Sequence, residues 1–514
     1  MKNLLIKNLD IRDLPQLGSV LTLAAVARLY NLGQPSLWID EVATIQVASY
    51  PLSKLWVTAY DPTPPLYYTL IHFGLNLGHT EFLLRLPSAL FGVLTVAVVY
   101  VATRRIGGSL AALAGSVLVA LSFHNLEYSQ EARAYSLLGF CLSVSFLGLV
   151  NLSLRWREDC SGFTISNMVA SGGGLYAAGL LAALYTHNTA VFYWLGVQPF
   201  FLIWWFRPLS FSRAALVSWL ALNFIALLLW LPWLSASLDI MDSGSFSWLH
   251  QLDFKSAYST WRRVHGMPAS LPGQPWIDAA LLVFALMGIY GLRKRPALCV
   301  LLVGLLLFSS AAIWAFGYVA APIFMLRTIL WGSLFSAVLI GLGVSYLPPR
   351  IGYAVVLVLT IAGANGAYQF HNTNRAENEN WRSAAEFIAK RSKHQDILLF
   401  RTHYITPPFF YYFDGISFPR EILGWNCIQE QALEGNIRYD GPLPRVAWSA
   451  SDLGPNKPIG KRAGSRLWII EAHCLARSWD KADNLFYPNW GLVKTHKFSG
   501  VYIHEMSSGH WPGF

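Results

Sequence analysis

Two adjacent carboxylates, Asp40 and Glu41, follow an apolar run that begins near Leu17. An Asp at the centre of a bilayer costs about 2.5–3.5 kcal/mol even on the mildest scale, so the pair must face water or a protein cavity. A carboxylate at the membrane edge can take the proton of a hydroxyl arriving from the aqueous side, which makes Asp40 a candidate base. Glu41 could orient Asp40 or bind an ion. The alternative is that the pair caps the following helix, since acids there complement free N–H groups and the helix dipole.

A second acidic cluster lies in a short polar stretch, residues 124–135, between two later apolar runs. Glu127 and Glu131 are four residues apart, so on one helix they would share a face and repel each other unless a cation lay beside them. That cation could be a metal ion held with Asp40, the guanidinium of Arg133, or a group of the substrate. An ion network between Arg133 and Glu131 that only closes the loop is the alternative.

A candidate cation, Arg327, stands at the start of a further apolar run. Its fork of donors suits the phosphate of a lipid-linked substrate, which Arg can bind bidentately. The alternative is that Arg327 only reaches out to a lipid headgroup. Two other polar features, His187 and the pair Tyr67-Tyr68, are by themselves typical of residues at a membrane interface.

The elements that must position these groups are membrane spans. Hydrophobic residues make up 54% of the chain and charged residues only 13%, which excludes a water-soluble globule. Apolar windows of about 17–25 residues predict about eleven transmembrane helices. Their approximate centres are Ala24, Val93, Leu118, Val144, Ala178, Leu195, Leu222, Leu286, Leu305, Phe335 and Val358.

The basic residues set the expected orientation. Arg and Lys cluster in alternate short loops, such as Arg104-Arg105 and Arg293-Lys294-Arg295, which predicts that these loops and the N-terminus are cytoplasmic. An odd number of spans then places the C-terminus outside. The net charge of +10 therefore requires no nucleic-acid partner. We interpret the first apolar segment as a retained span, because no small-residue cleavage site follows it.

We expect two domains. Residues 1–370 form a transmembrane domain with long outer loops at 34–85 and 234–275, and residues 371–514 form an extracytoplasmic α/β domain with strand-like runs at 396–400 and 466–470. The first loop should contain a helical stretch followed by an amphipathic segment near residues 66–77. Cys427 and Cys474 both fall in the outer domain, where a disulfide could persist; the sequence leaves that pairing open. No Cys and His spacing resembles a zinc site.

In order, these stretches resemble the membrane glycosyltransferases of the GT-C superfamily, in the bacterial branch related to protein O-mannosyltransferases and the lipid A aminoarabinose transferase. The resemblance covers about residues 21–388, and its motifs say little about substrate. They are Trp38-Ile39-Asp40-Glu41, Pro64-Pro65-Leu66-Tyr67-Tyr68, the run from Tyr128 to Leu137, Tyr185-Thr186-His187, Leu231-Pro232-Trp233-Leu234, Arg327 and Asn380-Trp381-Arg382.

The resemblance implies a mainly α, polytopic enzyme of the bacterial inner membrane. It would move a sugar from a polyprenyl-phosphate donor to a hydroxyl of a glycan, lipid or protein on the extracytoplasmic face. Asp40 would be the base with Glu41 beside it, Glu131 the second acid, and Arg327 the phosphate ligand. Further candidate substrate-binding residues are Arg133, Tyr135, Asp61, Tyr67 and His187.

Three points stay open at this stage. Relatives often place His or another polar residue before Pro-Pro-Leu, whereas this chain has Asp61-Pro62-Thr63, which puts the role of Asp61 in doubt. A divalent metal held by Asp40 and Glu131 is a second open point, because metal dependence varies within the superfamily. The third is a rival function, a transporter or flippase for a lipid-linked or hydrophobic substrate, although duplicated halves with broken midplane helices are missing from the sequence.

Overall fold

The protein was analysed as a computed structural model that describes residues 10–57, 63–155, 165–205, 213–242, 249–266, 274–374, 379–393, 396–400, 405–413, 421–424, 466–472 and 491–507. The chain divides into two compact units. The first contains residues Met1–Leu32 and Pro51–Phe370, and the second contains Gly33–Tyr50 together with His371–Phe514. The second unit therefore joins a short piece of the first loop to the C-terminal domain.

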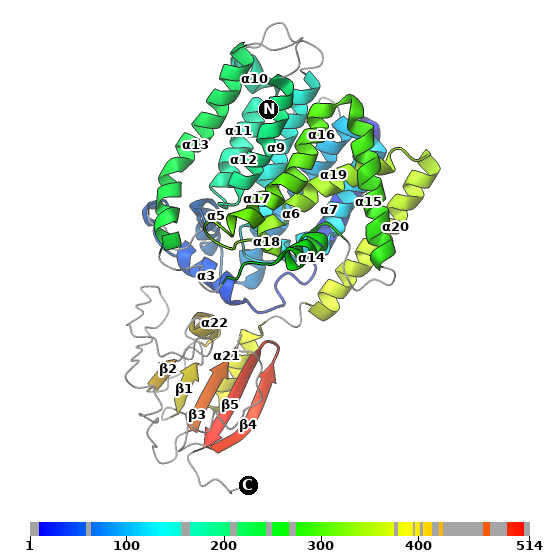
Figure 1. The fold of residues 1–514 in the computed structure, drawn as a ribbon. Helices are drawn as coiled ribbons and strands as arrows, with labels where there is room; N and C mark the ends of the chain where they lie inside the picture. Colours follow the sequence, from blue (N-terminus) through cyan, green and yellow to red (C-terminus); the bar gives the residue numbers. More distant parts are fainter. Residues whose placement is uncertain are drawn as a thin grey trace. The chain divides into compact units, whose positions relative to one another are not determined.

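The first unit is a bundle of helices (Figure 1). Its elements are η1 (Ile11–Asp13), α2 (Leu14–Leu29), α4 (Leu52–Leu55), α5 (Pro65–Leu75), α6 (Glu81–Gly107), α7 (Ser109–Leu121), α8 (Phe123–Ser129), α9 (Tyr135–Arg155), α10 (Ile165–Met168), η2 (Val169–Gly173), α11 (Gly174–Leu184), α12 (Ala190–Trp205), α13 (Arg213–Asp242), α14 (Phe254–His265), α15 (Gln274–Gly291), η3 (Leu292–Lys294), α16 (Pro296–Val303), η4 (Gly304–Phe308), α17 (Ser309–Phe316), α18 (Leu326–Ile329), α19 (Gly332–Val344) and α20 (Pro349–Gln369).

All eleven expected span centres fall within these helices. By length and hydropathy, seven helical segments among the described residues can cross a bilayer, and two shorter apolar helices accompany them. The chain is thus a multi-pass membrane protein. One of the seven segments, Glu81–Leu121, holds two expected centres and bends at Gly108, whose φ of 87° is readily adopted only by glycine. The expected outer loop at 234–275 is more helical than the sequence indicated, because α13 continues to Asp242 and α14 follows.

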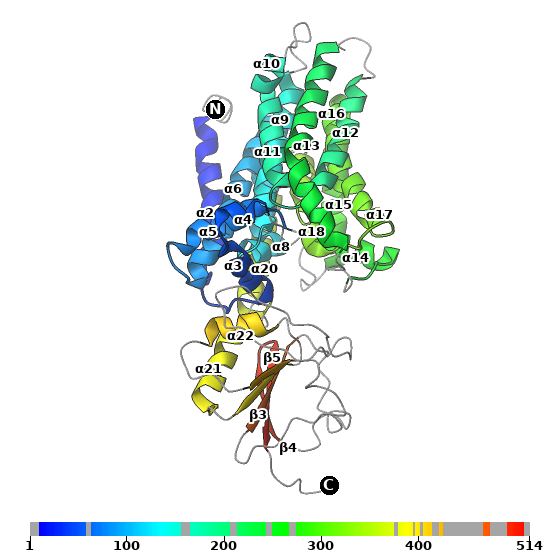
Figure 2. The ribbon, with the colours of Figure 1, turned by 90° about the vertical axis from the view of Figure 1, so that its left-hand side faces the viewer.

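The loops expected on one side of the membrane meet at one end of the bundle. Arg104 forms an ion pair with Asp13 at 3.0 Å, and the Ser109 hydroxyl donates to the same carboxylate at 2.7 Å. Arg295 donates to the Ile106 carbonyl at 2.8 Å, which brings the α15–α16 connection to the end of α6. Helices α5, α14 and α18 lie at the bundle end away from α10 in both views, here called the α5 end (Figures 1 and 2).

Among its described residues, the second unit contains a five-stranded mixed sheet with the order β2-β1-β3-β5-β4. Strand β1 pairs in parallel with β2 and β3, whereas β5 pairs antiparallel with β3 and β4. The expected strand-like runs correspond to β1 and β3. The elements are α3 (Ile39–Ala48), η5 (Phe370–Asn374, which begins at the unit boundary), α21 (Trp381–Arg391), β1 (Ile397–Phe400), α22 (Thr406–Tyr412), β2 (Glu421–Gly424), β3 (Arg466–Glu471), β4 (Gly491–Phe498) and β5 (Val501–Ser507).

A hydrophobic core holds α21 and α22 to this sheet. Trp381 and Ile388 of α21 and Phe409 of α22 are fully buried against Phe400 and Trp468 of the strands. The side chain of Asn380 accepts a hydrogen bond from the Ser383 amide at 3.1 Å and so caps the start of α21. The Asn-Trp-Arg stretch that opens the domain therefore lies where its first helix meets the sheet. Cys427 and Cys474 lie outside the described residues, so their pairing stays a prediction.

Candidate active site

The two adjacent carboxylates have different surroundings within the second unit. Helix α3 begins at Ile39, so Asp40 and Glu41 both lie in its first turn. Glu41 is fully buried, and its Oε2 accepts a hydrogen bond from the Trp38 amide at 3.2 Å, as the acid of a capping box does. Asp40 is only half-buried. The capping role considered for the pair thus belongs to Glu41.

The polar stretch between α7 and α9 forms a short helix and a turn. Helix α8 ends at Ser129, so Glu131 lies beyond it, in the turn. Glu127 and Glu131 therefore do not lie on one helix, which is the condition under which they would share a face. Instead, Glu127 pairs with His124 across one turn of α8, with 2.9 Å between Oε2 and Nδ1. Glu131 is thereby separated from the other acid and sits where the chain turns into α9.

Gln130 anchors this turn. Its side chain is almost fully buried, and its Nε2 donates to the carbonyl oxygens of Arg28 at 2.8 Å and Tyr30 at 3.0 Å. These carbonyls belong to the end of α2, where the last turn of a helix leaves acceptors unsatisfied. The residue next to Glu131 therefore fixes the turn to the point at which the first loop leaves the bundle.

The acids and Arg327 all influence the pKa of the Tyr128 hydroxyl. Burial raises the pKa of its hydroxyl, the carboxylates of Glu131 and Glu127 and the ring of Tyr135 raise that pKa further, and the Arg327 guanidinium lowers it. The opposing effects on one phenol place Glu131 and Arg327 within electrostatic reach of the same point. The α8–α9 turn and α18 thus contribute opposite charges to one region of the first unit.

A local turn presents Arg327. The Met325 amide donates to the Thr328 hydroxyl at 3.1 Å, and that hydroxyl lies 2.7 Å from the Ile323 carbonyl, so the start of α18 is closed on both sides of Arg327. The guanidinium Nε donates to the Met325 sulfur at 3.0 Å. The side chain is half-buried at the α5 end of the bundle.

His265 packs behind this turn without adding a second positive charge. Its Nδ1 lies 3.1 Å from the Ser336 hydroxyl, and its ring contacts Trp261 with centroids 4.5 Å apart. Burial of the ring lowers the pKa of His265 to about 3, so the imidazole is neutral near pH 7. Of His265 and Arg327, only Arg327 therefore carries a positive charge.

Two more motifs reach the same end of the bundle. The Tyr135 ring contacts His187 with centroids 5.6 Å apart, and the Arg133 guanidinium lies 5.9 Å from the Tyr135 centroid. The Leu66 amide donates to the Tyr185 carbonyl at 3.0 Å, which joins the start of α5 to the end of α11. Four stretches that are distant in sequence, around residues 66, 131, 187 and 327, therefore gather in the first unit.

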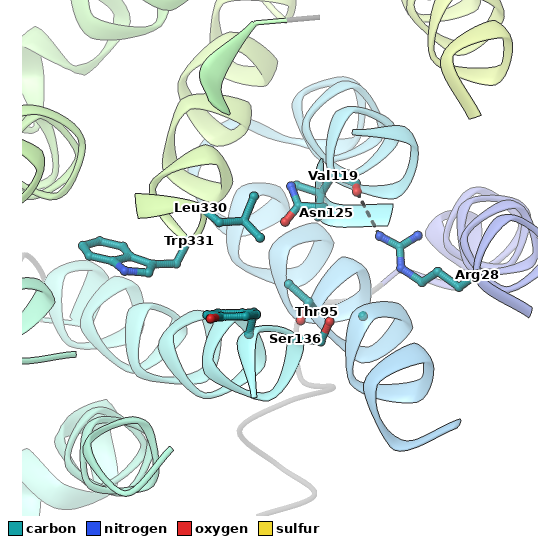
Figure 3. A pocket seen from close by; sticks show the side chains of 10 residues that line it. Arg28, Thr95, Val119, Asn125, Ser136, Leu330 and Trp331 are labelled. Atoms are coloured by element: carbon teal, nitrogen blue, oxygen red, sulfur yellow. Dashed lines mark hydrogen bonds between the residues drawn. The ribbon is translucent and has the colours of Figure 1, made fainter. Parts of the chain in front are cut away.

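A small pocket, with a cavity volume of about 20 Å³, lies among these elements (Figure 3). It is lined by Tyr135 and Asn125, by Leu330 and Trp331 just beyond Arg327, and by Arg28 of α2. Asn125 donates to the Ser333 hydroxyl at 2.9 Å and so ties α8 to α19. Among the described residues, the buried indole N–H of Trp331 meets no hydrogen-bond acceptor.

Comparisons with solved structures place this arrangement in a known fold. The chain is similar to ArnT from Cupriavidus metallidurans in the apo state, with a TM-score of 0.53, 13% identity, and coverage of 95% of this chain and 97% of that chain. The same protein bound to undecaprenyl phosphate gives a TM-score of 0.52. The chain has the GT-C fold.

A second GT-C structure, the oligosaccharyltransferase of Archaeoglobus fulgidus tethered to an acceptor peptide, matches with a TM-score of 0.51 and 13% identity. That match covers 90% of this chain and 69% of the other. No protein-family model matches the sequence, and no curated protein matches it. The GT-C fold expected from the motifs is thus confirmed by three-dimensional similarity.

The remaining sequence candidates occupy varied positions in this GT-C chain. Tyr67 is buried, and its hydroxyl lies 2.7 Å from that of Ser88, which donates in turn to the Arg133 carbonyl at 3.0 Å. Asp61 lies outside the described residues.

Among the described residues, no group of three His, Cys, Asp or Glu side chains could hold a metal ion. Asp40 and Glu131, the pair considered for a metal ion, belong to different units.

Sequence reasoning missed one charged residue of this GT-C bundle, Arg28. It is 1% exposed, and its guanidinium donates to the Ala120 carbonyl at 2.7 Å and the Val119 carbonyl at 3.2 Å (Figure 3). Those carbonyls end α7, where a cation complements both the free acceptors and the helix dipole. A charged residue inside an apolar run is a signal that could have identified it.

Proposed function

We propose that the protein is a glycosyltransferase that moves a sugar from a polyprenyl-phosphate donor to a hydroxyl acceptor on the extracytoplasmic face of a bacterial inner membrane. One observation carries the proposal: Glu131, Arg327 and the pocket beside Tyr135 gather at one end of a GT-C bundle. A lipid-linked phosphate can reach this end from the bilayer while its sugar remains at the water-facing side. That ArnT has been solved with undecaprenyl phosphate supports the donor class.

The proposed reaction is a single displacement. Asp40 accepts the proton of the acceptor hydroxyl, whose oxygen bonds to the anomeric carbon of the donor sugar. The bond between that carbon and the phosphate oxygen breaks, and polyprenyl phosphate leaves with the electron pair. The configuration at the anomeric carbon is therefore inverted. A double displacement would require a second carboxylate nucleophile about 5 Å from the acid, as in retaining glycosidases.

Arg327 supports this step by pairing with the phosphate as its negative charge grows, an interaction that is strongest in the transition state. Glu131 carries the charge opposite to that of Arg327 and acts on the same Tyr128 hydroxyl. We propose that it orients the sugar or the acceptor. We assign the sugar to the region around Tyr135, which lines the small pocket together with Trp331. Arg133 and His187 support the Tyr135 ring from neighbouring turns.

We propose that the acceptor is a hydroxyl on a lipid, glycan or protein. Purified protein in lipid vesicles, offered a panel of labelled polyprenyl-phosphate sugars and acceptors, should transfer label from at least one lipid donor. Nucleotide sugars should give none, because they carry no prenyl chain for the bilayer. Transfer from nucleotide sugars alone would contradict the proposed donor class.

Glu41 should serve the reaction through structure alone. Glu41→Gln keeps an oxygen that accepts the Trp38 amide, so we expect transfer within a few-fold of wild type. Glu41→Ala removes the cap and should cost about 1 kcal/mol in the stability of the helix start. Transfer rates and the melting temperature of both variants test this. Loss of transfer in Glu41→Gln comparable to that in Asp40→Asn would instead assign Glu41 to the chemistry.

A further inference from the structure

The segment that carries Asp40 is hydrogen-bonded to the C-terminal domain within the second unit. Glu379, which is 8% exposed, accepts the Ile39 amide through Oε2 at 3.3 Å and the indole N–H of Trp381 through the same atom. Ile39 is the first residue of α3 and directly precedes Asp40. One carboxylate of the outer domain therefore holds the peptide next to the proposed base.

Other contacts hold the preceding residues. The Leu37 amide donates to the Tyr412 hydroxyl at 2.7 Å. The Ser36 hydroxyl accepts the Trp381 amide at 3.1 Å and lies 3.1 Å from the Glu379 carbonyl. Arg382 donates to the Gln34 carbonyl at 3.1 Å. These bonds span sequence separations of more than 340 residues, and they fix the segment at several points, which limits its rotation as well as its position.

The domain side of this contact is closely packed. Trp381 is fully buried in the core of the domain, and the Asn380 amide donates to the Ser499 carbonyl at 2.7 Å. Gly500, in the β4–β5 turn, has a φ of 69°, and a Cβ placed there would lie 3.1 Å from the Glu379 Cα. The hairpin of the sheet therefore packs directly against the backbone of Glu379. An acceptor supported in this way can define the place of the peptide it binds.

We propose that Glu379 is a positioning residue for the transfer reaction, through which the C-terminal domain sets the geometry of Asp40. This inference rests on the proposed function, because it takes Asp40 as the base. A proton acceptor displaced by about 1 Å can lose about 100-fold in rate, even when the substitution lies away from the chemistry. The C-terminal domain then contributes to the reaction through the position of Asp40.

Three variants test the proposal in the full-length protein. Glu379→Met keeps the length of the side chain and removes the acceptor for Ile39, so kcat should fall about 100-fold while the KM for the lipid donor stays within twofold. Glu379→Gln retains an uncharged acceptor oxygen and should recover most of the rate. Glu386→Met is the matched control, because Glu386 is an exposed acid on α21 that pairs only with Lys390 among the contacts shown by the structure. It should behave as wild type.

Hydrogen–deuterium exchange gives a readout that does not depend on activity. Peptides that cover residues 33–50 should exchange faster in Glu379→Met than in wild type, since the Ile39 amide loses its acceptor, while peptides from α21 and the sheet keep their protection. Loss of protection throughout the domain would show that the effect is unfolding and would overturn the positioning role.

Asp40→Asn is measured alongside. If Asp40→Asn is inactive and Glu379→Met turns over within twofold of wild type, the positioning role is wrong and the proposed function stands. If Asp40→Asn keeps normal turnover, the base assignment fails and the role of Glu379 fails with it. A rise in donor KM at unchanged kcat in Glu379→Met would also overturn the proposal, because it would move Glu379 from acceptor activation to donor binding.

Discussion

Asp40→Asn should abolish glycosyl transfer while the protein remains folded. The amide has nearly the same shape as the carboxylate and cannot take the proton of the acceptor hydroxyl. General base catalysis contributes about 100- to 10,000-fold to a rate, so we expect kcat to fall by at least that lower figure. Donor binding should be unchanged, because Arg327 and the Tyr135 pocket belong to the other unit.

The matched control for this variant is Asp253→Asn. Asp253 caps α14, accepting the Ser256 amide at 2.8 Å, and Asn caps helices about equally well. The control should therefore retain wild-type turnover. Initial rates at saturating donor and acceptor, with thermal unfolding of both variants, separate lost chemistry from lost structure. Normal turnover in Asp40→Asn would remove this residue as the base.

Arg327→Ala should weaken binding of the lipid donor. A hydrogen bond to a charged group contributes about 1.5–3 kcal/mol, so losing a bidentate guanidinium–phosphate pair should raise the donor KM about 10- to 100-fold. Because the phosphate gains charge as it leaves, kcat should fall as well. Arg327→Lys restores the charge without the planar fork and should recover only part of the loss.

Arg293→Ala is the control for Arg327→Ala. Arg293 lies over the Tyr290 ring in the α15–α16 connection, at the end of the bundle away from Arg327. Its removal should leave donor affinity unchanged. Binding of polyprenyl phosphate to each variant in detergent micelles measures the effect directly. Equal affinity in wild type and Arg327→Ala would assign Arg327 to headgroup anchoring.

Much of the transmembrane architecture could be predicted because it depends on local patterns. Apolar runs located a helix at every expected centre, and the β-branched and aromatic runs located β1 and β3. The spacing of Glu127 and Glu131 could not show whether they share a helix, because helix α8 stops at Ser129, where Gln130 turns inward and hydrogen-bonds to the end of α2. A local sequence pattern cannot predict this contact, because it joins residues about 100 positions apart.

The candidate site was predictable in its residue types and less so in its assembly. Motifs pointed to Glu131, Arg327 and Tyr135, and the fold gathers these in one unit. The different surroundings of Asp40 and Glu41 could not be predicted from the sequence. Both acids suit a helix start, and only their burial in the structure distinguishes them. The attachment of residues 33–50 to the C-terminal domain could not be predicted. Glu379 and Tyr412 accept hydrogen bonds from the backbone amides of Ile39 and Leu37, and every residue except proline has such an amide.

The central claim is that the protein breaks the bond between a sugar and a polyprenyl phosphate. It is tested most directly by counting, in one vesicle preparation, the sugar joined to acceptor and the polyprenyl phosphate released. We expect equal amounts from wild-type protein and neither product from Asp40→Asn. Movement of intact lipid-linked sugar across the bilayer, with no polyprenyl phosphate released and no sugar transferred, would contradict the account and identify a transporter.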